Sequence, residues 1–243
     1  MISARICPLL GAALLFAAAS SAQNLEAALG RMERLSKGFH AATADVHKIA
    51  YTNVIKQSEE SSGRLTVFRA KSRDLRMLFE IEKPDPGAVA YADDKVQIYY
   101  PKLAEVQEYD LGGKQSRLIE EFLLLGFGTS TSDLRKKYSI KYLEVTTVQG
   151  LPADLLELVP KSTEAREHFP RIEMWVAQDG GYPLRLKLHQ PSKDYQEAEY
   201  TKVRVNPPTI TEASVGMKLP EGVRIVRQRS SRDAASGKQA PVK

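Results

Sequence analysis

A change of hydrophobic period near Thr43 is the feature that most constrains how this chain can fold. Before it, apolar residues recur at helical spacing between Leu25 and Phe39, and Asn24 is the expected N-cap. After it, apolar and polar residues alternate in short runs separated by turn residues. The pattern predicts one amphipathic helix followed by an antiparallel sheet of short strands.

The alternating runs predict about eleven strands in an α+β fold. Two helices at 118–125 and 132–138 interrupt them, the second capped by Ser132, and Gly126 and Gly128 end the first. The simplest architecture is one strongly curved antiparallel sheet, an open half-barrel whose concave apolar face is covered by helices. The expected strands surround Ile49 and Ile55, Leu65, Phe79, Ile98 and Val106, the runs 140–148, 155–159, 172–177, 184–189 and 197–205, and Val226.

The first 22 residues have the pattern of a cleaved export signal. Arg5 precedes an apolar run at 6–19, and small residues lead to the expected cleavage site after Ala22. The run is shorter than the roughly 20 residues that span a bilayer. We therefore expect a signal peptide at 1–22, a single domain at 23–228, and a soluble protein in the periplasm. The only cysteine, Cys7, would leave with the signal, so no disulfide is expected.

The positive charge of the chain is concentrated at its C-terminus. The pI is near 9.1, but residues 23–226 carry 29 basic and 29 acidic side chains. The segment 227–243 carries a net charge of +4, and 229–243 has the composition of a disordered basic tail. A nucleic-acid-binding body concentrates positive charge on one face, so we expect no nucleic-acid partner.

The sequence contains no recognisable catalytic or metal-binding constellation. Its four histidines fall on different predicted elements, and no spacing typical of a zinc site occurs. Asp93 and Asp94 are expected in a hairpin turn. We therefore expect neither cofactor, metal nor enzymatic activity, with a hydrolase that uses Asp93 or Glu120 as the open alternative.

The segment 118–125 is more apolar than a surface helix requires. It is either ordinary core or a lid over an apolar cavity that receives a ligand. In the second case the lid side chains would be Leu118, Phe122 and Leu125, and the lining would come from facing strands: Ile49, Tyr51, Val67, Met77, Phe79 and Ile98.

Several segments resemble the periplasmic outer-membrane lipoprotein carrier family, the LolA type. They are the end of the first helix at 35–40, the stretch 63–69, the hairpin 93–101 and the closing Leu-Pro-Glu-Gly-Val at 219–223. The resemblance covers roughly 25–228, and it depends on the order and spacing of these segments. The sequence departs from the family pattern in several places: Phe79 and Ile98 stand where tryptophan is usual, Met77 stands where phenylalanine is usual, and the proline expected after the latch arginine is absent.

The resemblance implies a function as well as a fold. A half-barrel of eleven strands would hold the acyl chains of a lipoprotein under a helical lid. The carrier, expected as a monomer, would take its cargo from an inner-membrane ABC transporter and deliver it to an outer-membrane acceptor. The family's arginine latch would correspond to Arg69 or Arg73. The alternatives are a binding protein for a phospholipid, glycolipid or polyisoprenoid, and a sensor of mislocalised lipoproteins.

Overall fold

The computed structural model describes residues 10–71, 74–111 and 125–228. Twelve strands form a single sheet in the order β12-β6-β5-β4-β3-β2-β1-β11-β10-β9-β8-β7. The strands are β1 (Ala41–Thr52), β2 (Gln57–Lys71), β3 (Asp74–Lys83), β4 (Gly87–Ala92), β5 (Lys95–Tyr100), β6 (Glu105–Asp110), β7 (Tyr138–Val148), β8 (Leu151–Pro160), β9 (Arg171–Ala177), β10 (Pro183–His189), β11 (Tyr195–Val205) and β12 (Arg224–Gln228).

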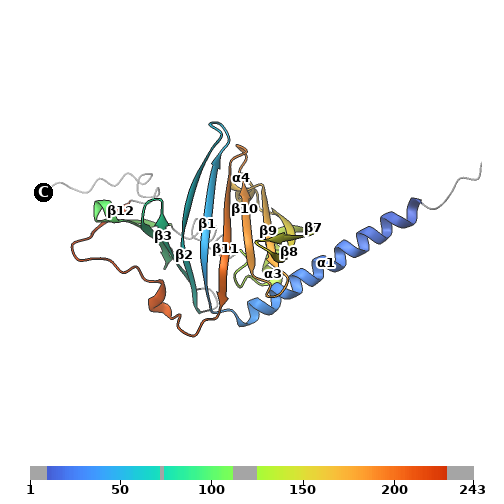
Figure 1. The fold of residues 1–243 in the computed structure, drawn as a ribbon, viewed down its shortest axis with the longest axis horizontal. Coiled ribbons are helices and arrows are strands. Elements are labelled where there is room, and N and C mark those ends of the chain that lie inside the picture. The colour runs from blue at the N-terminus through green and yellow to red at the C-terminus, as the bar shows by residue number, and fades with distance from the viewer. Residues whose placement is uncertain (1–9, 72–73, 112–124, 229–243) are drawn as a thin grey trace, which may run out of the picture.

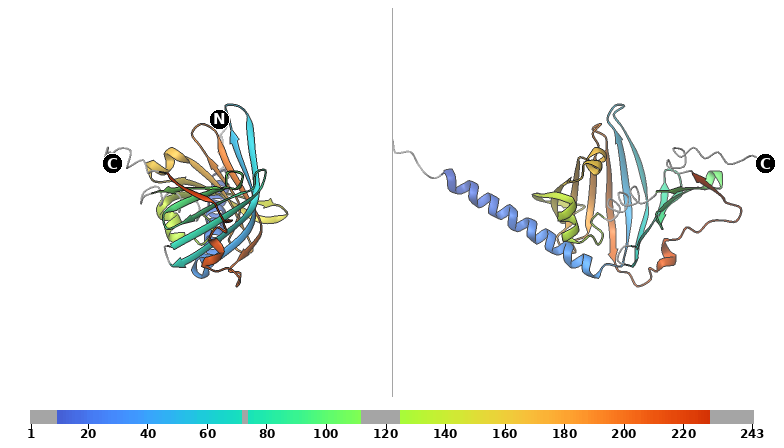
Figure 2. Two further views of the ribbon diagram at one scale, coloured as in Figure 1. Left: turned by 90° about the vertical axis from the view of Figure 1, so that its left-hand side faces the viewer. Right: turned by 180° about the vertical axis from the view of Figure 1, so that it is seen from behind.

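The sheet is strongly curved and does not close, as Figures 1 and 2 show. All neighbouring strands pair antiparallel except β12, which runs parallel to β6. The curved half-barrel expected from the sequence is confirmed. The strand left out of the prediction is β4, whose Gly-Ala-Val-Ala-Tyr-Ala sequence lacks a clear alternation of apolar and polar residues and follows two prolines.

Three α-helices and two short 3-10 helices accompany the sheet in the described part of the chain. The α-helices are α1 (Leu10–Gly38), α3 (Thr131–Lys137) and α4 (Thr163–His168); the 3-10 helices are η1 (Pro101–Leu103) and η2 (Glu212–Val215). No helix among the described residues combines the length and apolar character needed to cross a membrane.

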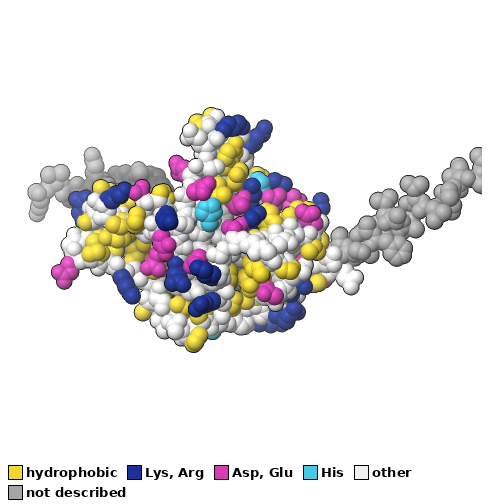
Figure 3. Space-filling model, in the orientation of Figure 1, with side chains coloured by type: hydrophobic (Ala, Val, Ile, Leu, Met, Phe, Trp, Pro, Cys, Tyr) yellow, Lys and Arg dark blue, Asp and Glu magenta, His cyan; other side chains and the backbone are white. Residues whose placement is uncertain are grey.

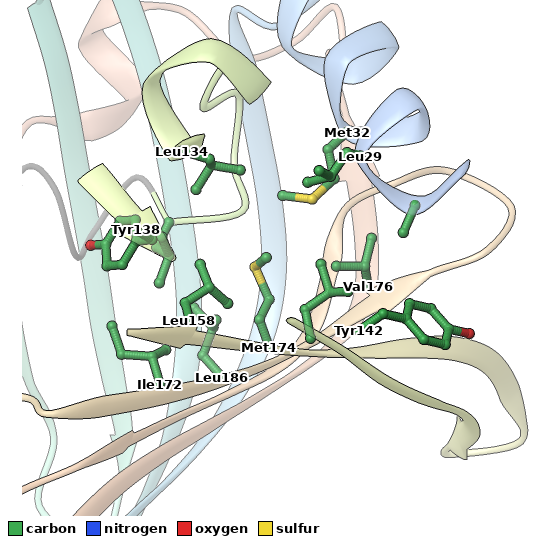
Figure 4. Close-up of a cluster of buried hydrophobic side chains, with 13 residues drawn as sticks. Leu29, Met32, Leu134, Tyr138, Tyr142, Leu158, Ile172, Met174, Val176 and Leu186 are labelled. Atoms are coloured by element: carbon green, nitrogen blue, oxygen red, sulfur yellow. The ribbon is translucent and has the colours of Figure 1, made fainter. Parts of the chain in front are cut away.

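The helices α1 and α3 cover one end of the concave face, which we call the inner face. Figure 4 shows Leu29 and Met32 of α1 and Leu134 of α3 facing the strands β7–β10. These three side chains are at most 2% exposed. They bury an apolar surface made of Tyr138, Tyr142, Leu156, Leu158, Ile172, Met174, Val176 and Leu186.

A polar network ties α1 to the sheet beside this core. Asp154 of β8 is buried and forms an ion pair with Arg31 of α1. Tyr142 Oη donates to Asp154 Oδ1 at 3.1 Å, and Gln178 Nε2 donates to the same oxygen at 2.8 Å. Gly181 allows the close approach, because a Cβ there would lie 2.6 Å from the Arg31 carbonyl carbon. The network fixes where the helix lies on the sheet.

The outer face of the sheet differs between its two ends. The segment between β11 and β12, including η2, crosses strands β2–β4 and buries Val215 against Leu78 and Ala90. Over β8–β11 the outer face carries charged residues instead, and Figure 3 shows acidic and basic side chains interspersed on the side of the molecule that displays β1, β11 and β10. The ion pair between Arg185 Nε and Glu197 Oε1, at 3.5 Å, belongs to this surface.

Two local predictions are wrong. Helix α1 is not capped at Asn24 but runs on from Leu10, since no proline interrupts this Ala- and Leu-rich stretch. Helix α3 begins at Thr131, because Ser130 rather than Ser132 accepts the capping hydrogen bond, here from the Asp133 amide. The predicted helices also did not include α4 at 163–168, which is capped by Ser162.

Candidate functional site

Strand register determines which side chains share the inner face of β1–β5. One cross-strand row contains Ala42, Val67, Met77, Tyr91 and Val96, and the next contains Ala44, Leu65, Phe79, Val89 and Ile98. Because side chains alternate between faces along a strand, both rows point to the same side. Together they make a continuous apolar surface across five strands.

The row through Val67 is closed by residues outside the sheet. Phe39, which follows α1, and Phe127 pack with Val67, Met77 and Tyr91 in one buried cluster. The ring of Phe127 also meets Tyr200 of β11 edge-on, with centroids 5.3 Å apart. This part of the inner face is packed in the manner of an ordinary core.

The row through Phe79 has different surroundings. Its cluster consists of Ala44, Val46 and Phe79 with partly buried Leu65, Ile81, Ala198, Tyr200 and Val203. All eight residues come from β1, β2, β3 and β11, so no described helix contributes to this cluster. The chain leaves the described part at Leu111 and returns at Leu125, and both residues pack against inner-face clusters.

Gly63 allows β2 and β3 to approach closely beside this cluster. A Cβ at this position would lie 1.9 Å from the carbonyl oxygen of Glu80. The register of β2 and β3 shifts at the same place, between Ser62 and Gly63. The glycine of the 63–69 segment is therefore required by backbone packing.

Arg69 links β2 to the turn at 125–128. Its Nη2 donates to the carbonyl oxygen of Gly128 at 3.1 Å, and its guanidinium lies 5.3 Å from the centroid of the Phe39 ring. Burial lowers the pKa of Arg69. Gly128 has φ +72°, and a Cβ there would lie 2.4 Å from Phe39 Cδ1, so both the turn and the contact favour glycine.

The inner face becomes polar towards the β1–β2 hairpin. Lys48 follows Val46 on the inner side of β1 and pairs across the strands with Ser61 and Ala198. The Nζ of Lys48 lies 5.8 Å from the centroid of the Phe79 ring. Glu59 pairs with Ala50 in the next inner-face row. A pocket of about 550 Å³ opens here, lined by Lys48, Ile49, Ala50, Glu59, Glu60, Ser61, Pro84, Asp85 and Gln196.

Five of the residues predicted to line a cavity lie on the inner face. Val67, Met77, Phe79 and Ile98 come from the strands, and Leu125 is buried against the α1 end. The prediction for Ile49 and Tyr51 is wrong, because they alternate with Val46 and Lys48 and point to the outer face. There Tyr51 stacks on Tyr195 with centroids 4.9 Å apart. Three predicted residues lie outside the described part of the chain: Arg73, Leu118 and Phe122.

The two aspartates considered for catalysis, Asp93 and Asp94, have a structural role in a turn. Asp93 and Asp94 form the two-residue connection between β4 and β5, with φ values of 50° and 61°. Asp93 also accepts a hydrogen bond from Arg76 at 3.5 Å. Glu120 lies outside the described residues. Within the described residues, no group of His, Cys, Asp and Glu side chains could hold a metal ion.

Several inner-face residues were not among those predicted from the sequence. Val46, Leu65 and Val89 could have been found from the period-two pattern, once β4 was recognised. Phe127 and Tyr200 could not have been found in this way. The position of Phe127 depends on a turn, and that of Tyr200 depends on the bulge in β11 near Lys202, which has φ 48°. Burial raises the pKa of Tyr200.

Comparison with known proteins finds similarity only at the level of fold. No family model and no curated protein matches the chain. An uncharacterized conserved protein from Thermus thermophilus has a similar structure, with 13% identity over 84% of this chain and 99% of its own, at a TM-score of 0.51. MucB matches at 17% identity over 82% of this chain and 63% of its own, with a TM-score of 0.48. A LolA-superfamily protein from Nitrosomonas europaea matches at 10% identity over 79% of this chain and 97% of its own, with a TM-score of 0.36.

These identities say nothing about a shared activity. The likeness to the Thermus protein shows a common fold, with nearly the whole of that protein aligned. The open, strongly curved half-barrel expected from the sequence is the architecture of this chain.

Proposed function

We propose that this protein is a periplasmic carrier that shields the acyl chains of lipoproteins on the β1–β5 end of its inner face. In this proposal it receives its cargo from an ABC transporter of the inner membrane and delivers it to an acceptor at the outer membrane. It acts by binding and release rather than by catalysis.

The observation that carries the proposal is the apolar cluster around Val46 and Phe79. At the β7–β10 end, α1 and α3 fill the inner face, whereas here the described chain supplies only strand residues. A curved apolar surface without a described helix of its own suits a flexible hydrocarbon chain, because each buried methylene contributes about 0.8 kcal/mol. The cluster also runs into an open polar pocket, through which a head group or polypeptide could remain in solvent.

Two further features are consistent with a carrier. The predicted signal at 1–22 would place the protein in the periplasm. Arg69 holds a backbone carbonyl next to the inner face, the arrangement expected of a latch, and we propose that it favours the ligand-free state. The prediction that 118–125 forms a lid stays a prediction.

The proposal is tested with an acylated peptide and a matched pair of variants. Phe79→Ala removes a ring from the inner face, and Tyr51→Ala removes a ring from the outer face of β1, where Tyr51 stacks on Tyr195. We expect Phe79→Ala to weaken binding of a palmitoylated peptide at least tenfold, about 1.4 kcal/mol. Tyr51→Ala should leave the affinity unchanged.

Thermal unfolding of both variants provides the control for folding. Failure of the wild-type protein to bind any acylated peptide would exclude the carrier function. Equal losses of affinity in the two variants would mean that the inner face is not the binding surface. Native mass spectrometry of protein purified from a periplasmic fraction would then show whether any cargo is retained.

A further inference from the structure

Lys48 is a cation at the edge of an apolar surface, and no described residue forms an ion pair with it. It lies on the inner face directly beyond Val46, and its Nζ approaches the ring of Phe79 within cation–π range. None of the described carboxylates lies within 4.0 Å of it, and the protein around it lowers the pKa of its ammonium group although the side chain still reaches solvent. An apolar side chain could pack against Phe79 equally well, so packing does not explain the positive charge of Lys48. The ammonium group is therefore available to bind an anionic group of a ligand.

Glu59 is an anion on the same face, one row further towards the solvent, and it has no ion-pair partner within the described part of the chain. It pairs with Ala50, whereas Lys48 pairs with Ser61, so the two charged residues are diagonal neighbours on adjacent strands. Diagonal neighbours are about 7–8 Å apart, and Lys48 and Glu59 do not form an ion pair. The other two acidic residues of the pocket are already paired, Glu60 with His47 and Asp85 with Lys102.

The order of chemical groups along the inner face is therefore apolar, cationic and then anionic. It starts at the Val46–Phe79 cluster, passes Lys48 and Ser61, and ends at Glu59 and Gln196 at the mouth of the pocket. A phospholipid with an amine head group has the complementary order, in which acyl chains are followed by a phosphate and then by an ammonium group. The phosphate and the ammonium group would then each meet an oppositely charged partner.

We propose that the pocket at the β1–β2 hairpin is a head-group site for a zwitterionic phospholipid of the phosphoethanolamine type. Lys48 binds the phosphate, with Ser61 as a further donor. Glu59 binds the ammonium group, and Gln196 lies beside it. The inference rests on the proposed function in one respect, since it requires the inner face to hold the acyl chains.

The test uses three single-chain lipids with the same acyl chain, each below its critical micelle concentration. Monoacylglycerol has neither charge, lysophosphatidic acid adds the phosphate, and lysophosphatidylethanolamine adds both groups. For the wild-type protein we expect lysophosphatidylethanolamine to bind at least tenfold more tightly than monoacylglycerol, as about 1.4 kcal/mol from charge-assisted hydrogen bonds implies. Lysophosphatidic acid should bind more weakly than lysophosphatidylethanolamine because Glu59 repels its extra charge.

Two variants separate the two halves of the site. Lys48→Met should abolish the preference for both phosphate-containing lipids and leave monoacylglycerol binding unchanged, whereas Lys48→Arg should retain the preference. Glu59→Gln should remove the preference for lysophosphatidylethanolamine over lysophosphatidic acid, because the variant neither attracts the ammonium group nor repels the charge of lysophosphatidic acid. The matched controls, Lys141→Met on β7 and Glu167→Gln in α4, are exposed and should change nothing.

The possible failures are distinguishable. Equal binding of the three lipids by the wild-type protein, or an equal loss for all three in Lys48→Met, would overturn the head-group site and leave acyl-chain binding standing. If none of the three lipids binds and acylated peptides also fail, the proposed function is itself wrong.

Discussion

The two ends of the inner face are built from the same kind of strand but are closed differently. At the β7–β10 end, side chains from α1 and α3 fill the concavity, and a buried network around Asp154 fixes α1 in place. At the β1–β5 end, the Val46–Phe79 cluster contains strand residues alone in the described part of the chain, and it leads to a pocket with unpaired charges. In the proposed function, one sheet carries a packed core at one end and a binding surface at the other, and the placement of the helices separates the two.

The largest difference between the ends should appear when Asp154 is replaced. In Asp154→Ala, the partly buried Arg31 loses its ion-pair partner, and Tyr142 and Gln178 lose their acceptor. We expect a loss of about 3–5 kcal/mol in the free energy of unfolding, measured with urea. The control is Asp45→Ala near the binding end, which breaks a more exposed ion pair with Lys202 and should cost less than about 1 kcal/mol. Similar losses in both variants would contradict a special role for the network.

Truncating one apolar side chain at each end compares the packing directly. Leu156 is fully buried beneath α1, and Leu156→Ala should cost about 2–5 kcal/mol, because the cavity cannot collapse against a fixed helix. Phe79→Ala removes a larger side chain, yet we expect it to cost only about 1–2 kcal/mol if the surface is built to accept a ligand. A loss of stability in Phe79→Ala as large as that in Leu156→Ala would mean that both ends are ordinary core.

Alkaline pH should loosen the packed end through Tyr142. Burial, together with the negative charge of Asp154, raises the pKa of Tyr142 to about 12. Because its folded pKa lies above its unfolded pKa of 10, its contribution to stability is complete below pH 10. That contribution is lost as pH rises from 10 to about 12, by up to roughly 2–3 kcal/mol. Urea unfolding across this range should show a smaller decrease for Tyr142→Phe than for the wild-type protein, with the remainder arising in part from Tyr200.

The sequence predicted the elements whose pattern is local. The alternation around Met77 and Phe79 identified a strand with the correct inner face, and Asp93 and Asp94 identified the tight turn that joins β4 to β5. The alternation in β1 was predicted correctly as well, but its two faces were exchanged. The larger apolar residues Ile49 and Tyr51 lie on the outer face, and the inner face carries the smaller Ala44 and Ala50. On this strand the inner face carries small residues near the core and a lysine beyond it.

The features that could not be predicted depend on distant parts of the chain. Strand β12 joins β6 in parallel because the segment containing η2 first crosses the outer face, and the pairing brings Arg224 to Glu105. The pairing of Arg31 with Asp154 connects residues 123 positions apart. The role proposed for Lys48 likewise depends on strand register, which places it beside Phe79 and without an ion-pair partner among the described carboxylates.

The smallest predicted change in stability concerns Arg69, which joins the two ends by holding the turn at 125–128 from β2. Arg69→Leu removes the hydrogen bond to the Gly128 carbonyl and the contact with Phe39, and should lower the free energy of unfolding by only about 1 kcal/mol. Its effect on release should be larger, because the proposed latch would favour the ligand-free arrangement. A bound acyl probe should then dissociate several-fold more slowly when that arrangement is weakened. Stopped-flow dissociation of the probe measures this rate, with Arg64→Leu, an exposed arginine of the same strand, as the control. Equal dissociation rates for the wild-type protein and both variants would leave Arg69 as a structural contact of the turn and would uncouple it from release.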